Sequence, residues 1–290
     1  MAGPDLPEPE WRRLNRANWD ERVGVHRAVP YDNGDFADGS ARLNPIEAAE
    51  LGDVAGLRVL HLQCHFGRDT LLLAQAGADV VGLDLSGPAI EAARADSAAL
   101  GIAARFVQAD LYDALLVVEP GSFDLVFTTW GTINWLPDIA AWGRVVAGAL
   151  RPGGRVYFAD IHPTALVFDD MAPGADGRPG WFAPYFEADA LHIDDASDYA
   201  DPDARLQNSR TVQFMHPLGS VVGALLAAGM RLDWLHEHPR ITWQAFRCLV
   251  RDAEGCWVWP DRPWFPLAVS LGATSVGAGP GWTPTGTGRA

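Results

Sequence analysis

The sequence predicts a doubly wound α/β fold built on a mostly parallel, seven-stranded sheet. Short apolar runs such as residues 59–62 and 123–127 are typical of strands buried on both faces. These runs alternate with helical patterns, and such alternation favours a parallel sheet covered by helices on both sides. Residues 59–86 also read as strand, tight turn, helix and second strand, the second strand ending in Asp84. A unit of this kind is a common ligand site.

The core elements follow from periodicity and from their end signals. Gly77 is expected to end the first core helix, while Ser86 and Asp138 are expected to cap the next two. The strands of this region are expected at 57–62, 79–84, 104–108, 123–128 and 154–160. The helices between them are expected at 69–76, 87–99 and 138–149.

The flanking segments complete a single domain over residues 1–276. Residues 1–45 should form an N-terminal helical cap, with apolar residues at helical spacing between 9 and 28. Residues 57–160 form the core, and 162–216 an insertion rich in Pro, Gly and Asp with clustered aromatic residues. A loop of this length is usually functional or disordered, and its aromatics argue against disorder.

Residues 217–276 supply the last part of the domain. We expect a helix at 218–228, a sixth strand at 230–236 and a final strand at 267–273. A hairpin is expected between them, turning at 252–255. Residues 277–290 are rich in Gly, Thr and Pro and should form a flexible tail.

The turn and the strand ends predict an adenosine-containing ligand. Asp84 is placed to bind the two hydroxyls of a ribose, and Asp110, at the end of the third strand, suits an adenine amino group. The dinucleotide pattern G-x-G-x-x-G is missing, because Gln63, His65 and Arg68 stand where it needs other residues and only Gly67 remains. A pyrophosphate needs bare backbone there, so S-adenosylmethionine, which has no phosphates, fits better.

Over residues 58–163 the chain resembles the class I S-adenosylmethionine-dependent methyltransferases. It is similar to a bacterial subgroup with HLQCHFG in place of D-x-G-C-G-x-G, followed by FDLVFTTWGTINWLPD and LRPGGRVYFADIHP. The resemblance implies a Rossmann-like methyltransferase fold, S-adenosylmethionine as cofactor and S-adenosylhomocysteine as product. His61 replaces the usual acid and Gln63 the first glycine, so contacts to the methionine end of the cofactor should partly differ.

The resemblance also implies the residues of the site. The N-terminal segment would lie over the cofactor cleft as part of a lid, and the insertion after the fifth strand would supply the acceptor pocket, with Asn134 and Trp135 also shaping it. The residues implied to line the cofactor are Trp19, Gln63, Gly67, Asp84, Leu85, Asp110, Leu111 and Trp130. The residues of the insertion expected to wall the acceptor are Trp181, Phe182, Tyr185 and Phe186.

Methyl transfer needs a positioned acceptor and, when that acceptor carries a proton, a base. His162 follows the fifth strand, where open α/β sheets place their sites, and titrates near neutral pH. Glu187, His216 and Tyr31 are the other candidates. No metal is expected, because His236 and His238 have no evident third ligand.

Composition narrows the partners. The net charge is −15 without a basic stripe, which disfavours nucleic acid, and no apolar run reaches the length of a membrane span. Three scattered cysteines suit a reducing cytoplasm. The expected partner is a small-molecule methyl acceptor, and either a monomer or a homodimer is compatible with the sequence.

The main hypothesis is methyl transfer to a small organic acceptor of secondary metabolism, aromatic or containing an indole or amine. Twelve tryptophans, concentrated outside the cofactor motifs, favour such an acceptor. The first alternative is an NAD(P)-dependent oxidoreductase on a similar sheet. The second is a non-catalytic binding protein that retains the cofactor fold.

Overall fold

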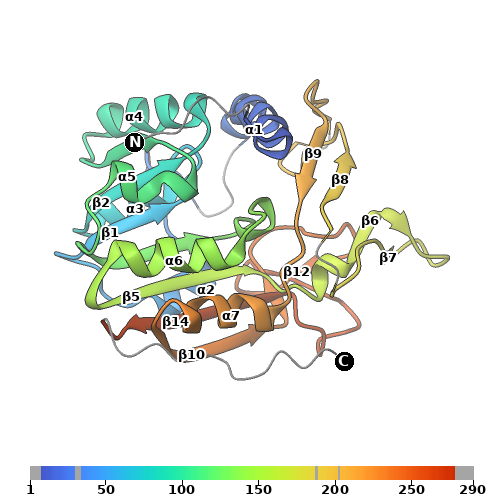
Figure 1. The fold of residues 1–290 in the computed structure, drawn as a ribbon. Helices are drawn as coiled ribbons and strands as arrows, with labels where there is room; N and C mark the ends of the chain where they lie inside the picture. The colour runs from blue at the N-terminus through green and yellow to red at the C-terminus, as the bar shows by residue number, and fades with distance from the viewer. Residues whose placement is uncertain (1–7, 30–33, 187–188, 202, 278–290) are drawn as a thin grey trace.

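A seven-stranded sheet in the order β10-β14-β5-β4-β1-β2-β3 forms the centre of the protein (Figure 1). The computed structural model describes residues 8–29, 34–186, 189–201 and 203–277. Only β14 runs antiparallel to its neighbours, β5 and β10. The strands are β1 (Arg58–Leu62), β2 (Asp79–Asp84), β3 (Arg105–Gln108), β4 (Phe123–Thr129), β5 (Leu150–Ile161), β10 (Met230–His238) and β14 (Ala268–Ser275).

Helices cover both faces of this sheet. One face packs against α6 and α7 around Trp142 and Phe158, and the other packs against α2 and α3 around Phe127 and Tyr157. Alternate residues of β5 therefore serve two separate cores, as the period of two along a strand requires. The helices of these layers are α2 (Pro45–Glu50), α3 (Arg68–Gln75), α4 (Gly87–Leu100), α5 (Ala114–Val117), α6 (Ile139–Ala149) and α7 (Leu218–Ala227).

The predicted core elements and the antiparallel last strand are confirmed. Ser86 accepts a hydrogen bond from Ala89 N, and Asp138 accepts one from Ala141 N, so both predicted caps form. The fifth strand begins at Leu150 rather than at residue 154. Leu150 already pairs with Phe123, and an irregularity in the register follows before the parallel pairing continues.

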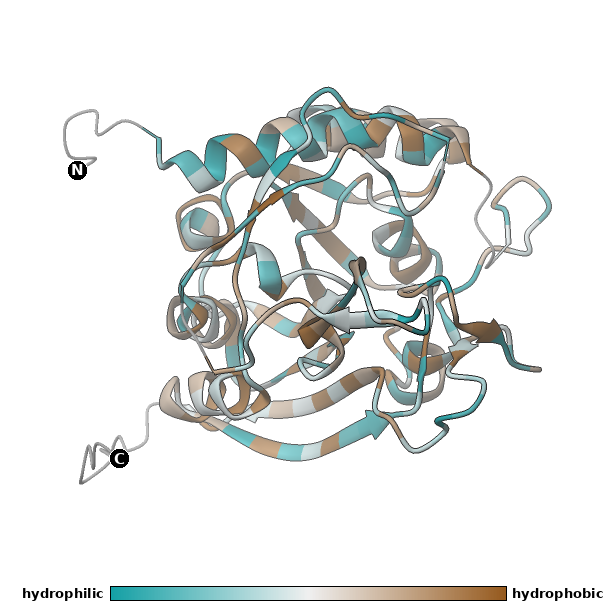
Figure 2. Cartoon of the chain, turned by 90° about the vertical axis from the view of Figure 1, so that its right-hand side faces the viewer, coloured by the Kyte–Doolittle hydropathy of each residue, from teal (hydrophilic) through white to brown (hydrophobic). Residues whose placement is uncertain are grey.

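The N-terminal helix α1 (Glu10–Ala28) lies outside these layers, next to β9 (Arg210–Gln213) and close to α4 (Figure 1). It carries both hydrophilic and hydrophobic residues along its length, as an amphipathic cover does (Figure 2). Two asparagines tie it to the chain near β9. Asn15 donates to Val212 O and accepts from Val212 N, while Asn18 donates to Asn208 O.

The insertion after β5 contains more regular structure than its composition predicts. It folds into two antiparallel ribbons, β6 (Phe168–Pro173) with β7 (Pro179–Trp181), and β8 (Leu191–Asp194) with β9. The predicted hairpin near the C-terminus is confirmed, and Asp252 holds its turn by accepting from Glu254 N and Cys256 N. The remaining elements are β11 (Arg240–Ile241), β12 (Val250–Arg251), β13 (Trp257–Val258) and the 3-10 turns η1 (Leu111–Asp113), η2 (Ile133–Trp135) and η3 (Ala165–Val167).

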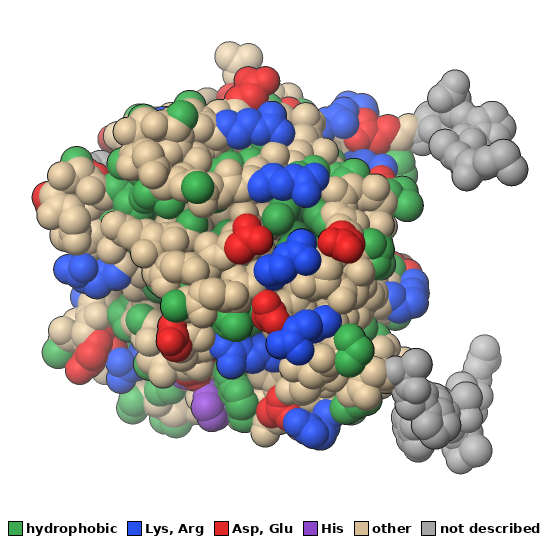
Figure 3. All heavy atoms as spheres, turned by 90° about the vertical axis from the view of Figure 1, so that its left-hand side faces the viewer, with side chains coloured by type: hydrophobic (Ala, Val, Ile, Leu, Met, Phe, Trp, Pro, Cys, Tyr) green, Lys and Arg blue, Asp and Glu red, His purple; other side chains and the backbone are tan. Residues whose placement is uncertain are grey.

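On the surface shown in Figure 3, basic and acidic side chains are interspersed, and arginines often lie beside aspartates or glutamates.

Within the described ranges, no helix is both long and apolar enough to cross a membrane. Most of the predicted tail, residues 278–290, lies outside the described residues.

Candidate active site

A cavity of about 640 Å³ opens at the carboxyl ends of β1, β2, β3 and β4, where an α/β sheet presents its ligand site. Side chains of α1 and of residues 242–257 close it from the other sides. All eight residues that the resemblance implied for the cofactor line this cavity, as do Asn134 and Trp135. The sheet edge thus brings together groups that lie more than 100 residues apart in the sequence.

The turn after β1 keeps the backbone of a glycine-rich turn without most of its glycines. Gln63 has a φ of 54° and His65 a φ of 51°, in the left-handed region that side chains disfavour. Such strain in non-glycine residues concentrates at functional sites. Gly67 shares this conformation with a φ of 77°. A Cβ on Gly67 would lie 2.5 Å from the Phe106 ring, so both this close packing and the positive φ exclude a side chain there.

Two buried side-chain atoms of this turn have no hydrogen-bond partner among the described residues: Gln63 Oε1 and His65 Nε2. The Gln63 amide nitrogen donates to Thr132 O, 2.9 Å away, which fixes the direction of its oxygen. Burial lowers the pKa of His65 to about 3, so its ring is neutral. Both residues line the cavity, and unsatisfied buried polar atoms at such a place are available to a ligand.

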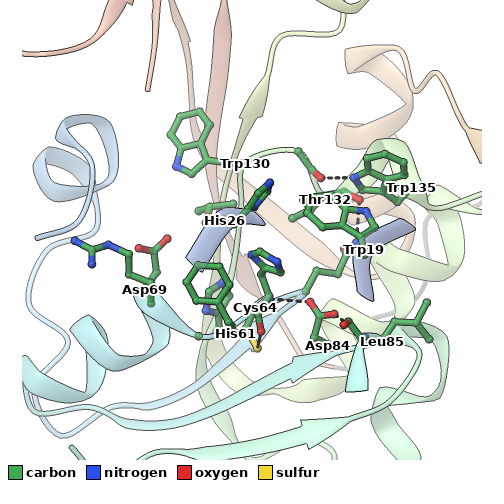
Figure 4. A pocket seen from close by; sticks show the side chains of 18 of the residues that line it. Trp19, His26, His61, Cys64, Asp69, Asp84, Leu85, Trp130, Thr132 and Trp135 are labelled. Carbon is green, nitrogen blue, oxygen red and sulfur yellow. Dashed lines mark hydrogen bonds between the residues drawn. The ribbon is translucent and has the colours of Figure 1, made fainter. Parts of the chain in front are cut away.

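Asp84 lies at the end of β2 and points into the cavity (Figure 4). Its two carboxylate oxygens accept hydrogen bonds from His65 N and Ser86 N, each 2.8 Å long. Burial raises the pKa of Asp84 to about 6, and the two backbone N–H groups oppose that rise. The carboxylate therefore both holds the turn after β1 and offers its remaining lone pairs to the cavity.

Asp110 has a partner that the sequence did not indicate. Its carboxylate accepts from Tyr112 N at 2.8 Å and forms an ion pair with Arg12 Nε of α1 at 2.7 Å. Burial raises the pKa of Asp110, and the bond from Tyr112 and the charge of Arg12 oppose the rise. The ion pair joins α1 to the sheet edge at the cavity.

Helix α1 contributes Trp11, Asn15, Trp19 and His26 to the cavity wall. The Trp19 ring lies 5.3 Å from His65 and 5.4 Å from Trp135 between ring centroids. The end of the helix is held by buried Asp198, which lies 2.7 Å from Arg22 Nη1 and 3.1 Å from His26 Nε2. The expected position of the N-terminal segment over the cleft thus matches the structure.

The loop after β4 forms another wall. Trp130, with a φ of 55°, donates its indole N–H to Glu47 Oε1. Asp160, near the end of β5, accepts from the backbone N–H groups of Gly131 and Thr132. Asp160 therefore holds this loop in place, and its side chain is buried.

Of the four catalytic candidates, the two that the structure describes do not line the cavity. His162 is buried, with Nδ1 2.6 Å from Thr164 Oγ1 and Nε2 3.0 Å from Glu237 Oε1. His216 is equally enclosed, and its Nε2 lies 2.7 Å from Leu136 O. Neither histidine belongs to the cavity wall. Tyr31 and Glu187 lie outside the described residues.

The aromatic segment expected to wall the acceptor also lies elsewhere. Trp181 is 79% exposed and packs in a tilted arrangement against Phe168, with ring centroids 4.7 Å apart, and Phe186 is 87% exposed. Tyr185 accepts a hydrogen bond from Leu218 N, and Phe182 packs in a small cluster with Val167. None of the four lines the cavity formed by the described residues. The aromatic walls come instead from α1, the loop after β4 and residues 242–257.

We expect Trp181→Ala to leave turnover nearly unchanged. An exposed side chain far from the cavity should change kcat/KM by less than about twofold and the free energy of unfolding by roughly 0.5 kcal/mol. Steady-state kinetics with a melting curve check this. A large loss of kcat/KM in a variant that melts normally would restore the segment as a lid.

The sequence analysis did not identify two acidic residues near the end of the cavity that lies opposite Asp84. Asp69, the second residue of α3, lines the cavity, and Glu47 of α2 lies fully buried behind Trp130. Burial raises the pKa of Asp69 to about 6, while burial and then the charge of Asp69 raise the pKa of Glu47 to about 8. In the sequence, only the Asp-Thr pair at residues 69–70, close after Gly67, could have indicated a role for Asp69. Nothing in the local sequence pattern indicated Glu47.

No group of three His, Cys, Asp or Glu side chains within the described ranges could hold a metal ion. His236 Nδ1 instead lies 2.8 Å from Glu50 Oε1, and His238 Nε2 lies 2.8 Å from Ser270 Oγ. These two histidines belong to the edge of the sheet and not to the cavity.

Comparison with known proteins agrees with this geometry. Residues 59–154 match the family model described as "Methyltransferase domain". A ubiquinone biosynthesis O-methyltransferase of Ralstonia nicotianae is 37% identical over 123 residues, which cover 42% of this chain and 51% of the relative. The chain spans about half the length of the first curated relatives it matches.

Solved structures share the fold. An S-adenosylmethionine-dependent methyltransferase from Mesorhizobium loti has a TM-score of 0.55 at 24% identity, covering 79% of this chain and 96% of that one. Magnesium protoporphyrin IX methyltransferase from Synechocystis, solved with S-adenosylhomocysteine, has a TM-score of 0.53 at 14% identity, covering 91% and 99%. The family model thus assigns residues 59–154 to a methyltransferase domain, and the solved structures show that the chain shares the fold of S-adenosylmethionine-dependent methyltransferases.

Proposed function

We propose that this chain transfers the methyl group of S-adenosylmethionine to a small aromatic acceptor. One observation carries the proposal: a single cavity joins the acids at the ends of β2 and β3 to a tryptophan-lined region at its other end. The first region suits adenosine and the second suits an apolar ring. A volume of about 640 Å³ is in the range of cavities that bind cofactors and small ligands.

The residues present fit the cofactor. Asp84 would bind the ribose hydroxyls and Asp110 the adenine amino group, with the apolar side chains of Leu85 and Leu111 beside the ring. Gln63 Oε1 and His65 Nε2, which lack partners, would serve the amino acid end. The same two side chains occupy the turn where a dinucleotide needs bare backbone for its pyrophosphate, which disfavours a nicotinamide cofactor.

The cofactor supplies an electrophilic methyl group on sulfur. The contribution of the chain is to hold the acceptor in line with that carbon and to exclude water. Trp19 of α1, Trp135 after β4 and Trp243 near the C-terminus enclose the cavity from three sides, which supports both tasks. The curated relatives are named O-methyltransferases, so a hydroxyl on an aromatic ring is the first acceptor to test.

Calorimetric titration with S-adenosylhomocysteine and, separately, with NADH tests the cofactor. Only the former should bind. Turnover of methyl-labelled S-adenosylmethionine is then measured against aromatic phenols and amines, and the methylated atom is located by NMR. Binding of NADH alone would favour the oxidoreductase, whereas tight binding of S-adenosylhomocysteine without turnover of any acceptor would favour a non-catalytic binding protein.

Asp110→Ala should weaken S-adenosylhomocysteine binding about threefold to tenfold, the value of a typical single hydrogen bond. The loss should be smaller than at Asp84, because adenine offers one amino group and ribose two hydroxyls. Arg12→Ala, which removes the ion-pair partner and keeps Asp110, is the matched control in the same calorimetric titration. A larger loss at Asp110 than at Asp84 would reverse the two assignments.

A further inference from the structure

One end of the cavity carries a carboxylate that the cofactor assignment does not use. Asp69 stands near the start of α3 and lines the cavity at the end opposite Asp84 and Leu85 (Figure 4). Both ends belong to one cavity of about 640 Å³, so adenosine at one end would leave the other end for a second ligand. The end near Asp69 is therefore the place to search for recognition of the methyl acceptor.

A second acid lies directly behind the wall at this end. Glu47 is fully buried, and its Oε1 accepts hydrogen bonds from the side chains of Trp130 and Asn44, each 2.8 Å long. Both donors line the cavity. The other oxygen, Oε2, is buried without a hydrogen-bond partner among the described residues. A buried polar oxygen in this state can still form a hydrogen bond.

The walls around these acids are aromatic. Trp130 and Trp243 meet edge to face, with ring centroids 5.6 Å apart, and both line the cavity. The faces of indole rings attract cations. Carboxylates combined with tryptophan rings make a common environment for an organic ammonium group.

Two basic side chains lie at this end of the cavity, and one of them is charged. His61 lines the same region, but burial lowers its pKa to about 3, so the ring is neutral. The Arg68 guanidinium donates to Gly34 O at 2.6 Å and lies over the Phe36 ring. At neutral pH the charged groups here are therefore the Asp69 carboxylate and the Arg68 guanidinium, since the raised pKa of Glu47 keeps its carboxyl group protonated.

We propose that these residues (Asn44, Glu47, Asp69, Trp130 and Trp243) form a cation subsite that binds a positively charged amino group of the methyl acceptor. The proposal rests on the proposed function. Asp69 contacts the ammonium group, Glu47 holds the side chains of Trp130 and Asn44 in place from behind the wall, and the indole rings pack against the carbon atoms next to the nitrogen. An acceptor with a carboxylate at this position is excluded by like charge.

Matched amine and alcohol probes test the subsite. The full-length protein, saturated with S-adenosylhomocysteine, is titrated by calorimetry at neutral pH with tryptamine and tryptophol, and with benzylamine and benzyl alcohol. Each amine should bind about tenfold more tightly than its alcohol, as one charge-assisted hydrogen bond allows. Asp69→Asn should reduce the preference to less than about threefold. Glu91→Gln, which removes an exposed acid of α4, should keep it.

The proposal would be overturned if the native protein bound amines and alcohols equally well or bound neither. It would also be overturned if Asp69→Asn kept the preference for amines. A third result concerns the cofactor itself, whose own ammonium group could be the partner of Asp69. If Asp69→Asn weakens S-adenosylhomocysteine but not 5′-methylthioadenosine, which lacks the amino acid end, Asp69 serves the cofactor and the acceptor proposal is wrong. Failure of S-adenosylhomocysteine to bind the native protein would instead reject the proposed function, and the amine preference can still be measured without it.

Discussion

Replacing Asp84 by alanine should weaken the binding of S-adenosylhomocysteine about tenfold to more than a hundredfold. Hydrogen bonds to a charged group contribute roughly 1.5–3 kcal/mol, and the ribose offers two hydroxyls. Alanine also removes the acceptor for His65 N and Ser86 N, so the strained turn after β1 loses the bonds that hold it. Calorimetric titration of the native protein and the variant measures the loss.

The ribose assignment also predicts how a ligand without the amino acid end should bind. 5′-Methylthioadenosine keeps the ribose and lacks the amino acid end, so Asp84→Ala should weaken it by about the same factor. Asp84→Asn keeps the volume and one acceptor oxygen, and should lose less. Equal affinity in Asp84→Ala and the native protein would reject the assignment, and melting curves separate a local loss from general unfolding.

The protonation of Asp84 adds a pH dependence to binding. Its pKa is raised to about 6, mainly by burial. Below this pH the carboxyl group gains a proton and loses its advantage as an acceptor of ribose hydroxyls, so affinity should fall as the pH drops from 7 to 5. Asp84→Asn should show a flatter profile over the same range.

The sequence predicted the core well because its signals are local. Apolar runs mark β1 and β4, and caps such as Ser86 fix helix starts within a few residues. The strand-end acids Asp84 and Asp110 could be placed because parallel strands present their carboxyl ends at one edge. Gln63 and His65 adopt the left-handed backbone of the glycines they replace, so the motif kept its shape despite its changed residues.

The parts that could not be predicted depend on contacts between distant segments. Asn15 pairs with Val212, 197 residues away, and His162 with Glu237, 75 residues away. The sequence shows that aromatic residues cluster near Trp181. Composition alone does not show whether this cluster packs at the cavity or away from it. The same limit hid Glu47, which is functional in our proposal only because Trp130 and Asn44 surround it.

Glu47 also gives rise to the largest expected effect on stability, and that effect depends on pH. Burial, followed by the charge of Asp69, raises the pKa of this carboxyl from 4.5 to about 8. Between these values the unfolded chain has released the proton and the folded protein still holds it. The folded state therefore binds more protons than the unfolded state, and the free energy of unfolding falls as pH rises through this window. The whole loss is roughly 5 kcal/mol at most, since one pKa unit corresponds to about 1.4 kcal/mol.

Glu47→Gln should remove this loss. Glutamine keeps an oxygen for the N–H groups of Trp130 and Asn44 but cannot ionise, so the variant should be about as stable as the native protein at pH 5 and roughly 2–4 kcal/mol more stable at pH 8. Urea unfolding at several pH values measures the difference, and all other titrating groups are common to both proteins. Glu91→Gln, on the exposed surface of α4, should give a curve parallel to that of the native protein. A parallel curve for Glu47→Gln as well would mean that the buried carboxyl ionises normally. Asp69→Asn provides the further check. Removing the neighbouring charge should lower the pKa of Glu47, so the loss of stability should still begin near pH 4.5 but should end at a lower pH and be smaller.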